Sequence, residues 1–354
     1  MRISVPSIPK VVLSATSPAR TITPAAATER IAEFLAPGNV ACITGAGVSV
    51  DSGIRAYRGD NGRYLNPNYK PIFYQELVDP TAKGFAFRLL LRLRSYLGYK
   101  PVKDALPNTT HYALAALQYT SLIKKVITQN VDGLHHKALA DVWDPVTAGE
   151  RILELHGTLH KVHCNHGHTV DRNTFQARLS ATNPQWKAFA DSLEVTGQKP
   201  RTNPDGDVVL EEGVRYDTFK VPECPECLLE DRRNSILKPD LIFFGESLRQ
   251  EARDRSYADI ESCDRLFIVG TTLATYSAFR LLKHALELKK PVLMLNVGPT
   301  RADSLEQVEK IELPSGLILR DVVRNVLGVN AMEEANVRRM LSSGVVQPPL
   351  DDDD

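Results

Sequence analysis

The chain has 354 residues, of which 43% are apolar and 24% are charged, and its 43 basic residues balance its 43 acidic residues. This composition is ordinary for a globular protein, and the length suggests one large domain with an accessory module. The balanced charge excludes a basic footprint for nucleic acid, and no apolar stretch approaches the roughly 20 residues that span a bilayer. Five cysteines at irregular spacing argue against a secreted disulfide framework and indicate a reducing compartment.

The first segment of the chain, residues 1–23, is expected to lie outside the folded domain. Residues 1–28 contain Arg2, Lys10 and Arg20 together with many Ser and Thr residues, and they contain no acidic residue. This composition predicts an organellar transit peptide, with a plain disordered tail as the alternative.

A regular alternation of strands and helices follows. Thr23-Pro24 predicts the start of a helix that extends to about Phe34, because an N-cap residue precedes a proline at the first helical position. The alternation predicts an α/β fold with a doubly wound, Rossmann-like parallel sheet. Strands are predicted at residues 39–44, 123–128, 152–155, 241–244, 266–269 and 292–295, and helices at 81–98, 109–120 and 276–289.

Changes in composition predict the domain organisation. Residues 61–80 are rich in Asn, Pro and Tyr, which predicts a long loop that could cover a ligand. Residues 161–235 contain His and Cys clusters and few apolar runs, which predicts a smaller inserted module. The main domain then comprises residues 24–160 and 236–330, and a short helix with an acidic tail follows at 331–354.

A glycine-rich turn follows the first predicted strand directly: Gly45-Ala46-Gly47-Val48-Ser49. Its glycines let the backbone approach a pyrophosphate, and a helix after the turn would supply oriented N–H groups. Tyr57 and Arg58 would place an aromatic face and a cation at the same pocket. The third glycine of the dehydrogenase fingerprint would fall at Val50, so the turn predicts a dinucleotide site without favouring hydride transfer.

Polar residues follow other predicted strands: Gln129, Asn130 and Asp132; His156; Gly270, Thr271 and Thr272; and Asn296. In open α/β sheets, ligands bind at the carboxyl ends of the strands, where these side chains would meet. The imidazole of His156, with an ordinary pKa of about 6.5, can act as a base near neutral pH. We therefore predict that His156 is catalytic, and the alternative is a structural histidine.

The predicted module contains candidate metal ligands. Cys224 and Cys227 have the two-residue spacing that lets two thiolates bind one zinc ion. Cys164 lacks a matching cysteine, but histidines surround it. We expect a structural Cys3His zinc site with His166 or His168 as the fourth ligand, His168 being preferred, and the alternative is a module without metal.

Taken together, these residues resemble the sirtuins, a family of NAD-dependent protein deacylases. The resemblance rests on motifs in the family order: Gly45–Ser49, Thr128–Asp132, Leu155–Gly157, Lys238–Glu246, Gly270–Leu273 and Leu295–Asp303. Three further segments resemble the class II branch around sirtuin four, which is mitochondrial: Asn183-Pro184-x-Trp186, Pro204–Asp207 and Ala274-x-Tyr276-Ser277.

The resemblance implies a set of roles. NAD would contact Gly45, Ala46, Gly47, Ser49, Tyr57, Arg58, Gln129, Asn130, Asp132, Gly270, Thr271, Thr272, Asn296, Val297 and Gly298. His156 and Asn130 would be catalytic, and an acyl-lysine peptide would pair as an added strand with Phe244, Gly245 and Glu246. The products would be free lysine, nicotinamide and O-acyl-ADP-ribose. The expected partner is an acyl-lysine protein, with no nucleic acid or membrane. The expected state is a monomer in the mitochondrial matrix, with the nucleus or cytoplasm as alternatives.

The sequence departs from the family pattern at several positions. The Pro and Asp that precede the aromatic residue and arginine in the family are Arg55 and Ala56 here. The Tyr-x-x-Arg pair that holds acidic acyl groups in the desuccinylase branch would correspond to Phe85 and Arg88. Two alternatives to a deacylase remain: a protein ADP-ribosyltransferase and a non-catalytic NAD-sensing protein.

Overall fold

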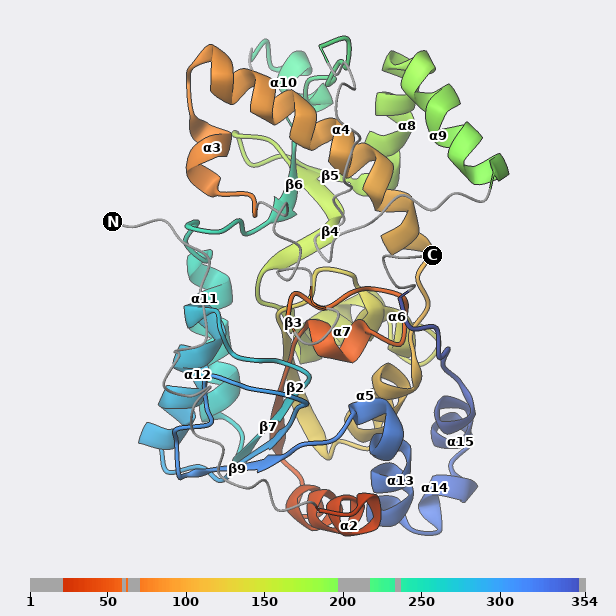
Figure 1. The fold of residues 1–354 in the computed structure, drawn as a ribbon, viewed down its shortest axis with the longest axis vertical. Helices are drawn as coiled ribbons and strands as arrows, with labels where there is room; N and C mark the ends of the chain where they lie inside the picture. The colour runs from red at the N-terminus through yellow and green to blue at the C-terminus, as the bar shows by residue number, and fades with distance from the viewer. Residues whose placement is uncertain (1–21, 59–61, 63–70, 197–216, 233–236, 350–354) are drawn as a thin grey trace.

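The computed structural model describes residues 22–58, 62, 71–196, 217–232 and 237–349. Figure 1 shows a larger part built on a parallel sheet and a smaller part built on a second sheet. The predicted transit segment, apart from its last residues 22–23, and the Pro204–Asp207 motif lie outside the described residues. No helix in the described ranges is long and apolar enough to cross a membrane.

The larger part contains a six-stranded sheet with the order β3-β2-β1-β7-β8-β9, in which every neighbouring pair is parallel. Its strands are β1 (Val40–Thr44), β2 (Ile123–Thr128), β3 (Ile152–Glu154), β7 (Arg265–Val269), β8 (Val292–Leu295) and β9 (Val308–Ile311). The chain builds outward from β1 to β3 and then returns to add β7 on the other side. This reversal creates a switch point at the carboxyl ends of β1 and β7, and it confirms the predicted doubly wound fold.

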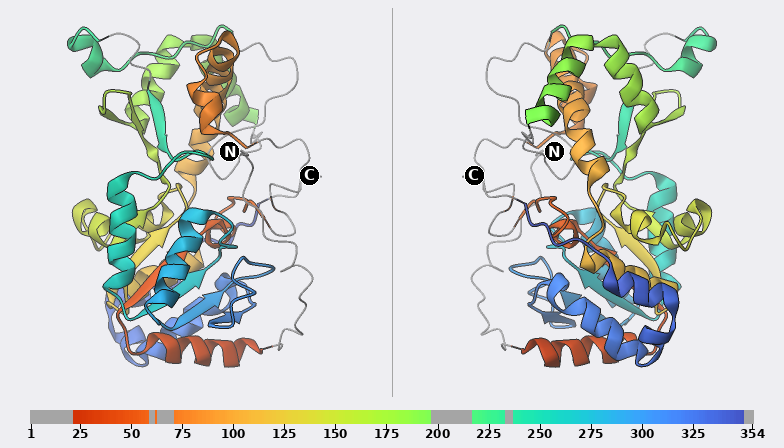
Figure 2. Two further views of the ribbon diagram at one scale, coloured as in Figure 1. Left: turned by 90° about the vertical axis from the view of Figure 1, so that its left-hand side faces the viewer. Right: turned by 90° about the vertical axis from the view of Figure 1, so that its right-hand side faces the viewer.

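Helices cover both faces of this sheet, as the two opposite views of Figure 2 show. One face packs against α2 (Pro24–Leu35), α5 (Thr109–Tyr119), α6 (Leu134–Leu139), α13 (Ser315–Leu327), α14 (Asn330–Glu333) and α15 (Ala335–Ser342). The other face packs against α11 (Gln250–Glu261) and α12 (Tyr276–Glu287). Strand β1 is buried along its whole length, with Cys42 in the first core and Ala41 and Ile43 in the second. A strand covered on both faces reads as a continuous apolar run, which is why the sequence predicted it.

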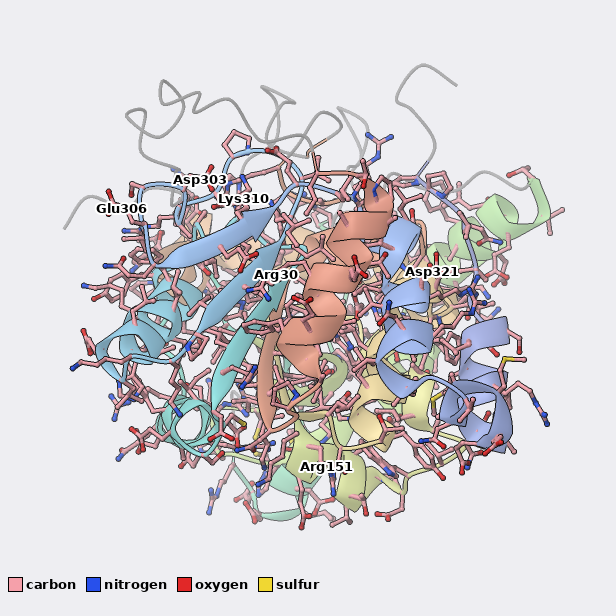
Figure 3. All side chains as sticks on the ribbon, turned by 90° about the horizontal axis from the view of Figure 1, so that it is seen from below. Arg30, Arg151, Asp303, Glu306, Lys310 and Asp321 are labelled. Carbon is pink, nitrogen blue, oxygen red and sulfur yellow. The ribbon has the colours of Figure 1, made fainter. Side chains whose placement is uncertain are left out.

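Local signals place the helix starts. Thr23 caps α2, because its side-chain oxygen accepts a hydrogen bond from the amide of Ala26 at 3.3 Å, and Pro24 stands in the first turn as predicted. Helix α2 lies beside the edge strand β9, where Arg30 forms an ion pair with Glu309 at 2.6 Å (Figure 3). This exposed pair contributes little to stability.

The smaller part holds an antiparallel sheet with the order β5-β4-β6, comprising β4 (Gly157–His163), β5 (Thr169–Asp171) and β6 (Lys238–Leu241). Around it lie α3 (Tyr74–Val78), α4 (Ala82–Asp104), α8 (Arg172–Thr182), α9 (Pro184–Thr196) and α10 (Pro225–Leu229); α7 (Pro145–Arg151) precedes β3 in the larger part. Helix α4 packs into the core of this part through Leu93, Tyr96 and Leu97. The second sheet thus reaches beyond the predicted module bounds of 161–235.

Two predictions for this region are wrong. Residues 241–244 do not form a strand of the parallel sheet, since β6 ends at Leu241 and pairs with β4. A short apolar run does not reveal which sheet it joins, because any buried strand has this character. Helix α4 extends to Asp104 rather than ending near residue 98, with Pro101 inside its last turn.

Candidate functional site

A cavity of about 900 Å³ lies at the carboxyl ends of β1, β2, β7 and β8. Its lining includes all the residues predicted to bind a cofactor or substrate or to act in catalysis: Gly45, Ala46, Gly47, Ser49, Tyr57, Arg58, Gln129, Asn130, Asp132, His156, Phe244, Gly245, Glu246, Gly270, Thr271, Thr272, Asn296, Val297 and Gly298. Arg55, Arg58, Arg253 and Arg280 also line it, which suits an anionic ligand.

The glycine-rich turn after β1 packs directly on the turn after β7. The amide of Gly47 donates to the carbonyl of Gly270 at 2.9 Å. A Cβ atom at Gly45 would lie 2.6 Å from the Cβ of Thr271, and one at Gly47 would lie 2.8 Å from the carbonyl oxygen of Gly270. Only glycine therefore fits at either position. This close backbone approach provides the surface on which a pyrophosphate could rest.

The prediction that an α-helix follows the turn is wrong. Residues Ala46–Ser49 form a single 3-10 turn, and the chain then bends away at Gly53, which has φ +82°. A four-residue turn has only a small dipole, so amide groups and nearby arginines remain the sources of positive potential.

His156 is oriented by two hydrogen bonds at the floor of the cavity. Its Nδ1 donates to the carbonyl of Gln129 at 3.2 Å, since a carbonyl oxygen can only accept. Its Nε2 then lacks a proton and accepts from the hydroxyl of Ser277 at 2.8 Å. Burial lowers the pKa of His156 to about 4, and the bond to Gln129 opposes this shift only in part. The side chain is therefore a neutral imidazole at pH 7 with a basic nitrogen.

A buried polar network supports the floor of the cavity beneath the turn. Ser49 donates from Oγ to Asp132 at 2.7 Å, and Asn130 donates from Nδ2 to the carbonyl of Gly45 at 3.1 Å and to Ser49 Oγ at 3.0 Å. His111 approaches Ser49 Oγ at 3.4 Å and packs edge-on against His135. Burial raises the pKa of Asp132 and lowers those of both histidines. The network thus holds the turn after β1 against the turn after β2.

Gln129 connects the β2 end to the β7 end. Its Nε2 donates to Thr271 Oγ1 at 2.8 Å, and its Oε1 accepts from the hydroxyl of Thr275 at 3.0 Å. These bonds fix the backbone carbonyl of Gln129 that orients His156.

The loop after β8 forms another wall of the cavity. The amide of Gly298 donates to Glu312 at 2.7 Å, and its carbonyl accepts from Lys310 at 2.8 Å. Lys310 also pairs with Asp303 at 3.1 Å, and Figure 3 shows the two side chains close together. Asn296 donates from Nδ2 to the carbonyl of Val297 at 2.8 Å and is only 6% exposed beside the cavity.

The predicted substrate segment lies where the two parts of the molecule meet. The carbonyl of Phe244 already accepts a hydrogen bond from the amide of Tyr74 at 2.9 Å. Glu246 accepts from Lys238 at 2.7 Å and from the amide of Phe243 at 2.9 Å, which closes the turn around Gly245. Gly245 has φ +80°, a left-handed conformation that favours glycine, so the segment turns here rather than continuing as a strand.

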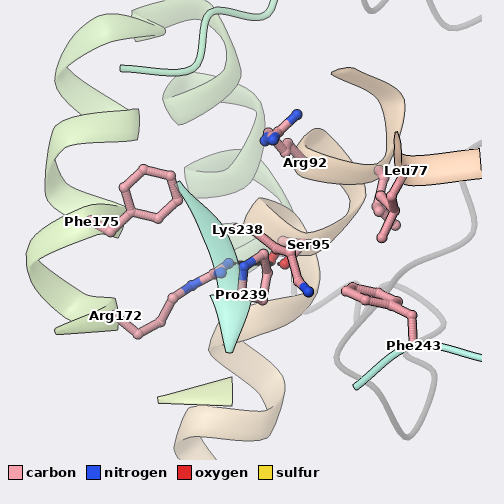
Figure 4. Close-up of a pocket in the computed structure, with 9 residues that line it drawn as sticks. Leu77, Arg92, Ser95, Arg172, Phe175, Lys238, Pro239 and Phe243 are labelled. Carbon is pink, nitrogen blue, oxygen red and sulfur yellow. Dashed lines mark hydrogen bonds between the residues drawn. The ribbon is translucent and has the colours of Figure 1, made fainter. Parts of the chain in front are cut away.

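Phe243 separates the cavity from a small pocket of about 20 Å³, which has room for about one water molecule. Figure 4 shows the guanidinium of Arg172 reaching across this pocket toward Ser95, whose carbonyl it contacts at 2.9 Å. Arg88 lines neither space: it donates to the carbonyls of Leu77 at 3.0 Å and Asp79 at 2.6 Å. These two bonds stabilise the turn between α3 and α4, and Arg88, which corresponds to the arginine of the desuccinylase pair, does not line the cavity.

The predicted metal ligands come together in the smaller part. The ligand atoms of Cys164, His168, Cys224 and Cys227 all lie within 4.8 Å of one another. His168 directs Nδ1 toward Cys227 Sγ at 3.3 Å and Nε2 toward Glu230 at 3.4 Å. Such a carboxylate contact orients metal-bound histidines in other proteins. His166 does not join the cluster, although its amide donates to Cys164 Sγ at 3.4 Å.

The electrostatics of this cluster suit a divalent cation. Burial raises the pKa of the Cys164 thiol, but hydrogen bonds from the amides of His166 and His168 and from the thiols of Cys227 and Cys224 together outweigh burial and hold it at about 7. Burial and the neighbouring sulfurs raise the pKa of Cys227 to about 12. A cation bound between the sulfurs would remove this mutual repulsion. Four protein ligands leave no open position, so a zinc ion here would be structural.

Comparison with known proteins agrees with this geometry. The model of the Sir2 family matches residues 45–277, which is more than half of the chain and contains the glycine-rich turn, His156 and the metal cluster. This chain belongs to the Sir2 family, the sirtuins.

Relatives of this sirtuin include members of the sirtuin-four branch, as predicted. A protein of Batrachochytrium dendrobatidis named NAD-dependent protein deacylase SIR4 is 40% identical over 82% of this chain and 90% of its own length. A Bos taurus protein named NAD-dependent protein lipoamidase sirtuin-4, mitochondrial, is 34% identical over 75% of this chain and 76% of its own length. A solved Sir2 homologue–NAD complex shares the fold with a TM-score of 0.57 at 22% identity, covering 88% of this chain and 94% of that chain.

Several groups around the site of this sirtuin were not predicted from the sequence. His111 contacts Ser49, and Ser277, which belongs to the Ala274-x-Tyr276-Ser277 motif, contacts His156, but no local pattern marks either residue as part of the site. Glu230 is separated by 62 positions from His168, whose ring it contacts. Pro348 and Pro349 line the cavity from the far end of the chain, and no sequence signal pointed to them.

Proposed function

We propose that this sirtuin is an NAD-dependent protein-lysine deacylase that releases nicotinamide and O-acyl-ADP-ribose. The observation that carries the proposal is the position of His156, whose unprotonated Nε2 faces the same cavity as the glycine-rich turn. The names of its relatives as deacylases support the same activity.

The residues present fit NAD. The close contact of Gly45 and Gly47 with residues 270–271 leaves backbone, rather than side chains, to meet a pyrophosphate. Asn130 and Asp132 would hold the nicotinamide-ribose half, and Asn296 with Gly298 the adenosine half. NAD would supply the electrophilic ribose carbon that the acyl oxygen attacks as nicotinamide leaves.

His156 would act as the general base. Its Nε2 would exchange the hydroxyl of Ser277 for a ribose hydroxyl and accept that proton, while Gln129 keeps the ring in the required tautomer. The acyl-lysine side chain would enter past Phe243, with its backbone along Gly245. The cluster of Cys164, His168, Cys224 and Cys227 would bind one structural zinc ion that stabilises this entrance.

A panel of acyl-lysine peptides tests this proposal. Nicotinamide release from NAD is measured with acetyl, long-chain, lipoyl and succinyl peptides, and products are identified by mass spectrometry. Acyl-dependent release with O-acyl-ADP-ribose is expected. Label transferred to a protein acceptor instead would establish an ADP-ribosyltransferase, and NAD binding without any release would establish a sensor.

The location in the cell is a separate part of the proposal. We propose a mitochondrial location, on the grounds of the basic, acid-free residues 1–28 and the mitochondrial name of the Bos taurus relative. A fluorescent fusion to the chain's C-terminus should overlap a matrix marker, and a cytosolic or nuclear signal would contradict this.

A further inference from the structure

We infer that the segment Ser343–Pro349 forms part of the cofactor site and covers the half of the cavity that binds the adenosine of the cofactor. The inference deepens the proposed function and rests on it for the identity of the ligand. In Figure 1 this segment, drawn in dark blue, leaves α15 and rises toward the junction of the two parts of the molecule. It contains no helix and no named strand, so contacts with other elements hold it in place.

The beginning of the segment is anchored beside the start of α5. Arg320 on α13 donates a hydrogen bond to the carbonyl of Ser343. Gly344 has φ +107°, and a Cβ atom there would lie 2.6 Å from the amide nitrogen of Thr109. The amide of Val345 donates to the carbonyl of Pro107 at 3.2 Å. This close approach requires glycine, and it directs the chain toward the cavity.

The middle of the segment pairs with Asp51 and Ser52, which follow the glycine-rich turn in the chain. The amide of Gln347 donates to the carbonyl of Asp51 at 2.7 Å, and Gln347 forms a parallel bridge with Ser52. The carboxylate of Asp51 lies at the start of α13, since a Cβ atom on Gly316 would be 2.4 Å from its Oδ2. Residues 51–52 thus contact both the segment and the start of α13. Removing the segment would leave only the contact with α13.

The end of the segment forms part of the cavity wall. Pro348 and Pro349 line the cavity together with Pro314 and Ser315. Two consecutive prolines have fixed φ angles and no amide hydrogen, so they form a stiff apolar surface that cannot pair with another strand. The amide of Asn296 donates to the carbonyl of Ile311 at 3.1 Å, three residues before Pro314, so this wall lies in the half of the cavity that contains Asn296. Such a wall suits the flat face of an adenine ring.

Two changes to the segment test the inference, with ADP-ribose and nicotinamide as separate probes. One variant lacks residues 344–354, and the other is Gly344→Val, whose side chain would collide with the backbone of Thr109. Deletion of residues 350–354 alone is the control for the first. Gly328→Val is the control for the second, because Gly328 also has a positive φ of +55° but has no neighbouring heavy atom within 4 Å.

Calorimetry should show ADP-ribose binding at least about ten-fold weaker in both test variants, a change of about 1.4 kcal/mol. Both controls should stay within about two-fold of the full chain, and nicotinamide affinity should not change in any variant. Thermal unfolding verifies that each variant is folded. Unchanged ADP-ribose affinity in the folded test variants would overturn the inference alone. Absence of ADP-ribose binding to the full chain would overturn it together with the proposed function.

Hydrogen exchange on the unaltered chain provides a second measurement that does not depend on how the variants fold. Coupling between two sites is reciprocal, so a segment that strengthens binding must itself be held more firmly by the ligand. ADP-ribose should slow exchange of the Val345 and Gln347 amides by at least about ten-fold. Equal exchange rates with and without saturating ADP-ribose would overturn the inference.

Discussion

At the scale of single residues, His156 shows how neighbouring groups determine the chemistry of a side chain. The carbonyl of Gln129 places the ring proton on Nδ1, and Ser277 marks the direction of the free lone pair. Because burial lowers its pKa to about 4, the ring is already in the basic form at neutral pH. Its environment therefore provides the orientation and the unprotonated state in which the ring can accept a proton.

His156→Ala is expected to reduce deacylation at least about 100-fold, because a positioned general base typically contributes that much. ADP-ribose affinity and the melting temperature should stay close to those of the unchanged chain. His284→Ala is the matched control, since His284 contacts Glu261 on the surface and does not line the cavity. Activity of His156→Ala above a tenth of the original would remove this residue from the proposed role.

His135 makes a second residue-scale prediction, which concerns stability and pH. Burial lowers the pKa of its ring to about 3 in the folded chain, whereas an unfolded histidine titrates near 6.5. Between these values the unfolded chain binds more protons than the folded chain. The contribution of His135 to stability is therefore complete above about pH 6.5 and is lost as the pH falls toward about 3.

His135→Gln removes this titration, so the destabilisation that it causes should shrink by about 2 kcal/mol between pH 7.5 and pH 5. Urea unfolding at both pH values measures the difference. Leu114→Ala is the control, because this fully buried side chain on α5 has no titratable group. A His135→Gln penalty that stays constant with pH would contradict the assignment of a neutral buried ring.

At the scale of elements, the site depends on how closely two strand ends approach. Strand β1 pairs with β7 from Val40 to Thr44 without interruption, which brings the turns at Gly45–Gly47 and Gly270 into direct contact. The unbroken register places the two strand ends side by side, and the glycines, which have no side chains, allow the two turns to touch. A longer side chain at either turn would push the strand ends apart and would occupy the place of a phosphate.

Gly47→Ala tests this contact. The new Cβ atom would lie 2.8 Å from the carbonyl oxygen of Gly270, which is backbone and cannot rotate away. We expect ADP-ribose affinity to fall at least about ten-fold, with a lower melting temperature. Gly149→Ala on α7 is the control, since no heavy atom lies within 4 Å of its added Cβ. Alanine is favoured over glycine inside a helix by roughly 0.5–1 kcal/mol, so the control should bind normally. Normal binding by Gly47→Ala would show that the contact is not needed.

At the scale of the whole molecule, the smaller part stabilises the entrance to the cavity but has a modest core of its own. Its hydrophobic cluster includes Cys164, Cys224 and Cys227, so the metal cluster is continuous with its packing. Without a cation these sulfurs repel one another once they are ionised, as the raised pKa of Cys227 shows. Metal binding and folding of this part should therefore be coupled.

Elemental analysis of the purified chain should find about one zinc ion per chain. A strong chelator should lower the melting temperature, and Cys227→Ser should lower both zinc content and stability. Cys263→Ser is the matched control, because this buried cysteine lies outside the cluster. Finding no zinc, together with a melting temperature that a chelator does not change, would contradict the metal site.

The sequence by itself determined the features that depend on neighbours along the chain. The apolar runs at residues 39–44 and 266–269 became β1 and β7, because strands buried on both faces need continuous apolar residues. The capping of α2 by Thr23 and the glycines of the turn after β1 are equally local. Contiguous motifs also identified the family, because they place characteristic glycines and polar side chains next to the ends of strands.

Only the tertiary structure decided the features that depend on contacts between distant residues. It placed His168 rather than His166 among the clustered cysteines, two of which, Cys224 and Cys227, come from about sixty positions away. It assigned β6 to the second sheet and gave Arg88 a structural role. It also brought residues 343–349 to the cavity. Local patterns carry no information about which remote backbone will supply a hydrogen bond, and these outcomes follow from packing of the whole chain.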